Sequence, residues 1–180
     1  MNRTKPEHQA EYSFKPSEYE SPGMRRTQEE LTRRAIELAG ITGGRVLDIG
    51  CGTGFSTQVL ADAGFEVAGI DPSKEMVAAA KARGLGCSEG SFEKIPFKDR
   101  EFDAVVSVSA LQWADYRKAA KEVSRVLKYS AKAAIQFYPE DDEDALRAAK
   151  AFAREGFRAT LAVDNPKNSK KKKTFLVLER

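Results

Sequence analysis

The stretch VLDIGCGTGFS, residues 46–56, constrains the fold of this chain more than any other. An apolar run ends there in three glycines, Gly50, Gly52 and Gly54, and a helical pattern follows at once. A buried strand, a glycine turn and a helix in this order are typical of an open parallel sheet, in which ligands bind beyond the carboxyl ends of the strands. The sequence therefore predicts a ligand site at the glycine loop.

Strand and helix patterns alternate along the rest of the chain. Near-continuous apolar strands separated by helices favour an α/β fold with a mainly parallel sheet covered on both faces. The last two strands have no helix between them, so we expect them to form an antiparallel pair. The candidate strands are residues 45–49, 66–70, 85–88, 103–108, 132–138, 157–163 and 174–178, and the candidate helices are 55–63, 73–83, 115–128 and 141–154.

Length and composition favour a single domain over residues 1–180. With 41% apolar residues, the chain can bury one sizeable core but is too short to add a separate substrate domain. We expect residues 1–26 to form an N-terminal arm and residues 27–180 to form the core. The sequence TQEE matches a capping box, which predicts that the first long helix begins at Thr27.

Charge and cysteine content exclude several classes of protein. The net charge of +3 is too small to indicate a nucleic-acid binder by itself, although residues 150–180 carry nine basic and three acidic side chains. Two cysteines, Cys51 and Cys87, and the single His8 are too few for a zinc cluster or a disulfide framework, so we expect no metal site. The polar start and the lack of a long apolar segment predict a cytoplasmic protein without a membrane span.

The spacing of the glycines separates three kinds of ligand. A triphosphate-binding loop needs a Lys followed by Ser or Thr after its glycines, and GCGTGFS has neither at that place. A dinucleotide loop needs its third glycine three residues after the second, where Phe55 stands instead. The pattern LDIGCGTG, with Asp48 before the first glycine and Asp71 at the end of the next strand, resembles motif I of the Rossmann-like S-adenosylmethionine (SAM) methyltransferases. That resemblance implies the class I methyltransferase fold and SAM as the cofactor.

The chemistry of SAM agrees with these residue types. SAM has no phosphate, so glycines would serve close backbone approach, and acidic groups suit its ammonium and its ribose hydroxyls. Ser73 is a candidate helix cap, which would leave the Asp71 carboxylate free for the ribose. The carboxylate that many of these enzymes use to read adenine is missing, since Ser91 and Phe92 stand there; Phe92 has an ordinary core role as its alternative. The expected cofactor-binding residues are Asp48, Gly50, Cys51, Gly52, Gly54, Asp71, Pro72, Ser91, Phe92 and Ser107.

Four further stretches are similar to one family in particular. They are KPEHQA at residues 5–10, VSALQW at 108–113, QFYPE at 136–140 and VDNPKNSKKKKTFLVL at 163–178. They resemble the small-subunit ribosomal RNA guanine-N7 methyltransferases, the family that includes the Williams-Beuren syndrome region methyltransferase. The resemblance implies transfer of a methyl group to N7 of a guanosine. It also suggests that the arm around His8 folds over the cofactor.

The resemblance places the substrate side after the fourth and fifth strands. Gln112, Trp113, Tyr138 and Glu140 are expected to position a guanine, with no general base, because N7 carries its own lone pair. Trp113 would stack on the base, but a lone Trp is as often a partly buried core residue, and Tyr138 has the alternative of simply closing its strand. Arg25 and Arg26 are weaker candidates for the SAM carboxylate; solvated residues before a helix are the alternative. The run Lys170, Lys171, Lys172 and Lys173 is expected to contact RNA phosphates if the hairpin after the sixth strand lies at the ligand edge, and otherwise to be a solvated loop.

The same family implies a protein partner. Its members are activated by a small zinc-binding protein that docks beside the sheet, and the third strand, LGCS, is expected to be a short edge without charged residues before Glu89. Such an edge can accept an added strand. Two other functions remain open at this point: methylation of a small metabolite, and a SAM-binding ribosome-assembly factor with little catalysis.

Overall fold

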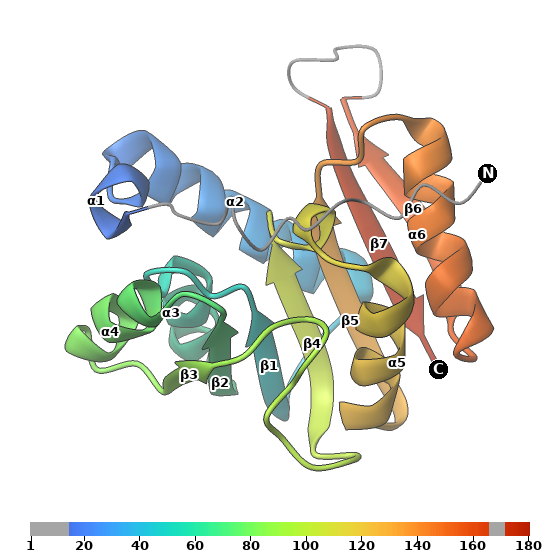
Figure 1. The fold of residues 1–180 in the computed structure, drawn as a ribbon, viewed down its shortest axis with the longest axis horizontal. Coiled ribbons are helices and arrows are strands. Elements are labelled where there is room, and N and C mark those ends of the chain that lie inside the picture. The colour runs from blue at the N-terminus through green and yellow to red at the C-terminus, as the bar shows by residue number, and fades with distance from the viewer. Residues whose placement is uncertain (1–14, 166–171) are drawn as a thin grey trace.

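The computed structural model describes residues 15–165 and 172–180 and contains a seven-stranded sheet (Figure 1). The strand order is β3-β2-β1-β4-β5-β7-β6, and among these strands only β7 runs opposite to the other six. The predicted α/β class, the mainly parallel sheet and the antiparallel pair of last strands are confirmed. The strands are β1 Arg45–Ile49, β2 Glu66–Asp71, β3 Cys87–Glu89, β4 Phe102–Val108, β5 Leu127–Phe137, β6 Arg158–Asp164 and β7 Lys173–Glu179.

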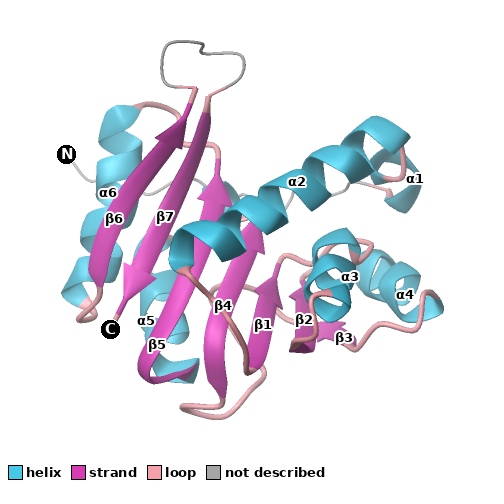
Figure 2. Ribbon diagram, turned by 180° about the vertical axis from the view of Figure 1, so that it is seen from behind, coloured by secondary structure: helices cyan, strands magenta, loops and turns pink. Residues whose placement is uncertain are grey.

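Helices cover the sheet on both faces. The long helix α2 lies across one face beside α3 (Figure 2), and α5 and α6 cover the other face (Figure 1). The described helices are α1 Pro16–Tyr19, α2 Pro22–Ala39, α3 Phe55–Asp62, α4 Lys74–Ala82, the short 3₁₀ helix η2 Leu111–Trp113, α5 Tyr116–Val126 and α6 Asp142–Arg154.

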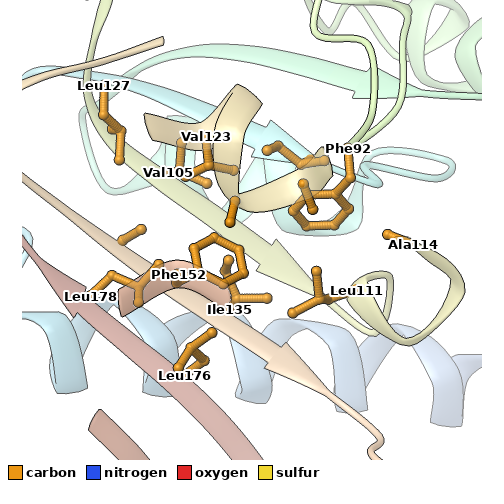
Figure 3. Packing of buried hydrophobic residues seen from close by; sticks show 14 of the residues in the cluster. Phe92, Val105, Leu111, Ala114, Val123, Leu127, Ile135, Phe152, Leu176 and Leu178 are labelled. Carbon is orange, nitrogen blue, oxygen red and sulfur yellow. The ribbon is translucent and has the colours of Figure 1, made fainter. Parts of the chain in front are cut away.

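Alternation along the strands divides the core into two parts. In β1, Val46 packs in the cluster with residues of α2, whereas Leu47 packs in the cluster with residues of α5 and α6. Successive side chains of a strand point to opposite faces, so a strand buried on both faces reads as a continuous apolar run. Figure 3 shows the larger cluster, in which Phe152 of α6 lies near Ile135 of β5 and Leu176 of β7. This two-sided burial explains why VLDI contains only one polar residue.

The first long helix begins at Pro22, five residues before the predicted start at Thr27, so that prediction is wrong. Ser21 is the N-cap and accepts a hydrogen bond from Met24 N at 3.2 Å, and proline suits the first turn because its missing N–H would be unpaired there. The Thr27 hydroxyl instead donates to Gly23 O inside the helix. Residues 22–26, which the sequence pattern places in the arm, are therefore part of helix α2.

The boundaries of the later elements differ from prediction mostly at their ends. The third strand is Cys87–Glu89 rather than 85–88. The fifth strand begins at Leu127, where a helix was expected to continue to residue 128, because Leu127 pairs with Phe102 before a register shift in the ladder. The predicted ligand edge is unaffected, since β1 ends at Ile49, as predicted.

Some predictions fall outside the described residues. The motif KPEHQA with His8 does, and so do Lys170 and Lys171. In the described ranges, each helix is too short or too polar to cross a membrane. The cytoplasmic location stays a prediction.

Candidate functional site

Two adjoining cavities open at the carboxyl ends of the parallel strands, around the glycine loop. The larger has a volume of about 350 Å³, which is within the size range of small-ligand sites. It is lined by Ile49, Gly50, Pro72, Ser73, Ser91, Phe92, Glu93, Ala110, Trp113 and Ala114. The smaller, about 30 Å³, is lined by Tyr19, Gln28, Gly50, Cys51, Gly52, Phe55, Ser56, Met76, Val108 and Ser109. Gly50 belongs to both linings, so the loop forms their shared wall.

The glycine loop needs its glycines for both space and conformation. Gly50 has a φ of 78°, and a Cβ there would lie 2.4 Å from Ala110 Cβ. Gly54 has a φ of 94° at the start of α3, and a Cβ there would lie 2.3 Å from Leu85 Cδ1. Side chains rarely adopt this left-handed backbone, and the neighbouring elements leave no room for one. The loop presents its backbone at the cavity walls through Gly50 and Gly52, and its contact with a ligand stays a prediction.

Asp71 ends β2 beneath the loop and holds it. Its Oδ2 accepts from Gly52 N and its Oδ1 accepts from Ser73 N, both at 2.9 Å. Burial raises the pKa of this carboxyl, and the two backbone donors oppose that rise. Ser73 caps α4, as expected, by accepting from Met76 N. The expectation that this cap leaves the carboxylate free is wrong, because each oxygen already accepts one backbone N–H and the side chain is fully buried.

Asp48 lies below the loop rather than in a cavity wall. Its Oδ2 accepts from the Ser56 hydroxyl at 2.7 Å and from the Thr57 hydroxyl at 2.6 Å, which anchors the first turn of α3. Its Oδ1 is buried without a hydrogen-bond partner among the described residues. Burial raises the pKa of Asp48 to about 6, against the lowering effect of the two hydroxyls, and Asp71 adds to the rise. Asp48 therefore positions the loop.

The other expected cofactor residues divide in the same way. Gly50, Cys51, Gly52, Pro72, Ser91 and Phe92 line a cavity, whereas Asp48, Gly54, Asp71 and Ser107 do not. Ser107 donates its hydroxyl to Ile49 O at 2.6 Å and joins the ends of β4 and β1. Phe92 both lines the cavity and packs in the core near Ala114 (Figure 3). Phe92 is thus both a cavity-lining residue and a core residue.

Glu93 is a cavity residue that the sequence analysis missed. It lines the larger cavity two residues after Ser91, and its Oε1 accepts from Asp115 N at 2.9 Å. A carboxylate thus lies near the place where the usual one is missing. Its position two residues after Ser91 was the available signal, but the turn at Ser91–Lys94 that brings it to the cavity was not predictable from strand patterns.

The structure brings together three of the four expected substrate-side residues. Trp113 lines the larger cavity and is 37% exposed, so it is partly buried and faces the cavity at the same time. The Gln112 side chain donates to Ser109 O at 2.8 Å and accepts from Tyr138 N at 3.5 Å. Tyr138 follows β5 directly and is 43% exposed, and its role in positioning the substrate stays a prediction. Glu140 is exposed on the following loop, where its backbone N–H donates to Asp144 Oδ2 at 3.1 Å.

The end of β6 and the start of β7 lie at the same edge of the sheet. Strand β6 is antiparallel to β7, as β5 is, so β6 runs in the direction of the parallel strands and ends at the ligand edge (Figure 1). Lys173 Nζ lies 3.3 Å from Tyr138 Oη and 5.3 Å from the centre of its ring. Lys172 forms an ion pair with Asp142 at 2.6 Å. The topological condition on which the expected phosphate contact depends is met.

The described part of the N-terminal segment also approaches the loop. Tyr19 of α1 lines the smaller cavity. Arg25 lies over the ring of Phe55, a lining residue, with its Cζ 5.6 Å from the ring centre, and pairs with Glu29. Arg26 pairs with Glu30 at the surface. Arg25 is therefore the nearer of the two arginines to the loop.

The pKa of Asp48 gives a test of this buried arrangement. An exposed Asp titrates near 3.9, so a pKa of about 6 means that folding takes up a proton at Asp48 between these values. The resulting stabilisation is fully present below pH ~4 and is lost as the pH rises through 6. The free energy of unfolding of the wild type minus that of Asp48→Asn should therefore fall by roughly 2 to 3 kcal/mol between pH 4 and 7. Urea denaturation of both proteins at each pH measures this; a constant difference would contradict it.

Comparison with known proteins shows similarity to methyltransferases. The family model of a methyltransferase domain matches residues 47–135. The 18S rRNA (guanine-N7)-methyltransferase of Schizosaccharomyces pombe is 33% identical over 171 residues, which cover 84% of this chain and 63% of that protein. Relatives of the same named activity from an amoeba, a yeast, a plant and mammals are 31 to 35% identical. The chain spans 59 to 63% of the length of these curated relatives.

Solved structures agree on the fold. A SAM-dependent methyltransferase from Aquifex aeolicus has a TM-score of 0.72 at 24% identity, over 92% of this chain and 98% of the other. A chain from the complex between the Haloferax volcanii Trm112 methyltransferase activator and the putative methyltransferase has a TM-score of 0.68 at 19% identity, over 91% of this chain and 96% of the other. The chain therefore has the fold of these methyltransferase structures, matches a methyltransferase-domain model over residues 47–135 and is similar over 84% of its length to the 18S rRNA (guanine-N7)-methyltransferase of Schizosaccharomyces pombe.

Proposed function

We propose that the chain is a SAM-dependent methyltransferase that methylates N7 of a guanosine in small-subunit ribosomal RNA. The observation that carries the proposal is the similarity over 84% of the chain to proteins named for this activity, together with an exposed Trp113 in the wall of the glycine-loop cavity. The chain contributes a cofactor half, around Gly50, and a substrate half, around Trp113. The two halves meet in a single cavity.

The residues of the cavity fit SAM. Gly50 and Gly52 permit close backbone approach, and Pro72 and Phe92 offer apolar surface for the adenine ring. Ser91 and Glu93 would meet the polar edge of the adenine. The buried carboxyls of Asp48 and Asp71 lie beneath the loop, where ionised carboxylates favour a cationic ligand, and SAM carries a sulfonium and an ammonium group. Bound there, SAM supplies an electrophilic methyl group.

On the substrate side, the chain has to orient the guanine. The lone pair of N7 lies in the plane of the ring and is available in neutral guanine, so no side chain has to remove a proton. Exposed aromatic side chains stack on splayed-out RNA bases, and Trp113 and Tyr138 are both exposed at this edge. Gln112 and Glu140 would meet the polar edge of the base. Rate enhancement would come from positioning of the two reactants.

We also propose a small zinc-binding activator as partner, at the open edge of β3. Among the described strands β3 pairs only with β2, and it presents the exposed Glu89. Gly86 O and Gly90 N bond to β2, so in an alternating parallel ladder the backbone groups of Glu89 point to the open edge. The neighbouring fold from Haloferax volcanii, which occurs in a complex with a Trm112 activator, supports the proposal. The zinc would belong to the partner.

Asp71→Ala should weaken SAM binding by about tenfold or more, because the change frees Gly52 N and removes a charge beneath the loop. Asp62→Ala is the matched control, since Asp62 is exposed at the end of α3 and bonds only locally to Gln58. Isothermal titration with SAM, in the presence of the activator, measures both variants. Absence of heat with the wild type would exclude the cofactor, and equal affinity of wild type and Asp71→Ala would remove Asp71 from the site.

Incubation with SAM and unmodified small-subunit rRNA should produce one new site of borohydride-aniline cleavage, which marks N7-methylguanosine.

Replacement of Lys170–Lys173 by alanine should weaken RNA binding and reduce the slope of its salt dependence by about 0.7 to 0.9 for each RNA phosphate that the variant no longer neutralises. Arg26→Ala is a control at an exposed ion pair. SAM binding without cleavage favours a small-metabolite enzyme or an assembly factor, and an unchanged salt slope returns the lysines to a solvated loop.

Glu89→Pro should weaken association with a purified Trm112-type activator by at least about tenfold, because proline removes the outward backbone N–H that an added strand needs. Glu89→Ala keeps that N–H and should bind within about twofold of the wild type. Titration calorimetry of the two variants decides between a backbone contact and a side-chain contact. Equal binding of the proline variant and the wild type would place the partner elsewhere.

A further inference from the structure

Ser109, directly after β4, has a backbone conformation that needs support. Its φ is 60°, in the left-handed region that non-glycine residues seldom adopt. Such residues persist where the surrounding structure holds them, and they gather at functional sites. Ser109 lines the smaller cavity beside the glycine loop. Groups from neighbouring elements therefore have to hold it in place.

Gln136, a fully buried residue near the end of β5, provides that support. Its Oε1 accepts from Ser109 N at 3.1 Å and from the Ser109 hydroxyl at 3.0 Å. Its Nε2 donates to Phe137 O at 3.1 Å, and its backbone O also accepts from Ser109 N at 3.0 Å. Both ends of the buried amide are thus satisfied, as a polar group in a core requires.

The turn that Gln136 holds leads to both halves of the site. On the substrate side, Ser109 O accepts from Gln112 Nε2 at 2.8 Å, and Gln112 precedes Trp113 in η2. On the other side, Gln28 of α2 donates to the Ser109 hydroxyl at 3.4 Å, and Gln28 lines the smaller cavity. A single chain of amide and hydroxyl groups therefore runs from helix α2 to the 3₁₀ turn.

We propose that Gln136 and Ser109 are positioning residues that set the orientation of the Gln112–Trp113 turn relative to the glycine loop. They touch neither reactant in this role and act through Gln112 and Trp113. Only the expected effect of Gln136 and Ser109 on catalysis rests on the proposed function. The orientation of Trp113 itself is open to direct measurement, because Trp113 is the single tryptophan of the chain.

Gln136→Met tests the proposal, since methionine has a similar volume but lacks both polar groups. Ser109 N keeps its bond to the Gln136 backbone O, so the sheet is preserved. We expect Trp113 fluorescence to shift in wavelength and acrylamide quenching to rise about twofold, with unchanged circular dichroism. In the methylation assay, kcat should fall about tenfold or more while the KM for SAM changes by less than about threefold, because misplacement acts on the reactive geometry.

Ser124→Ala is the control: it removes a buried hydroxyl that donates to Glu155 O and accepts from Arg180 away from the site, and it should leave Trp113 unchanged. Ser109→Ala, which keeps the backbone bond, replaces Gln136→Met if that variant does not fold. Wild-type-like fluorescence and quenching in the substituted protein overturn the proposal. If the wild type itself transfers no methyl group, the proposed function fails while the fluorescence still decides the positioning role.

Discussion

The site depends on the connection between the glycine loop and the end of β2. Gly50 N and Cys51 N both donate to Ile70 O, at 2.8 and 3.0 Å, and Gly52 N donates to the Asp71 carboxylate. These bonds fold the chain sharply away from β1 and hold it over its neighbour. The turn requires left-handed backbone, so glycine is needed where the loop meets Ala110. Both cavities share this loop as a wall.

Two buried carboxyls under the loop carry a cost that their hydrogen bonds only partly offset. Burial raises the pKa values of both Asp48 and Asp71, and Asp48 keeps one oxygen without a partner among the described residues. A protein that needed only a tight turn has less costly ways to cap a helix. Negative charge at this depth is favourable when a cationic ligand binds nearby, which agrees with the proposed cofactor.

The reversed strand β7 begins at the edge of the sheet where the site lies. Because β7 lies between β5 and β6 and runs opposite to both, the end of β6 and the start of β7 lie at the carboxyl edge of the parallel strands. Lys173 there contacts Tyr138, from the end of β5. Trp113, Tyr138 and Lys173 thus come from three separate stretches at the same edge of the sheet, an arrangement that agrees with the proposed contact to RNA.

The amino-acid sequence by itself determined the strand–glycine–helix unit, the mainly parallel sheet and half of the residues that line the larger cavity, because periodicity and glycine spacing are local properties of the chain. The prediction from sequence missed the N-cap at Ser21. The segment TQEE matches a capping box, but the helix already begins at Pro22. Only the tertiary structure decided that Asp71 is bonded to backbone, that Glu93 reaches the cavity and that Gln136 supports Ser109. These contacts join residues from separate elements, so they depend on how the strands and turns pack.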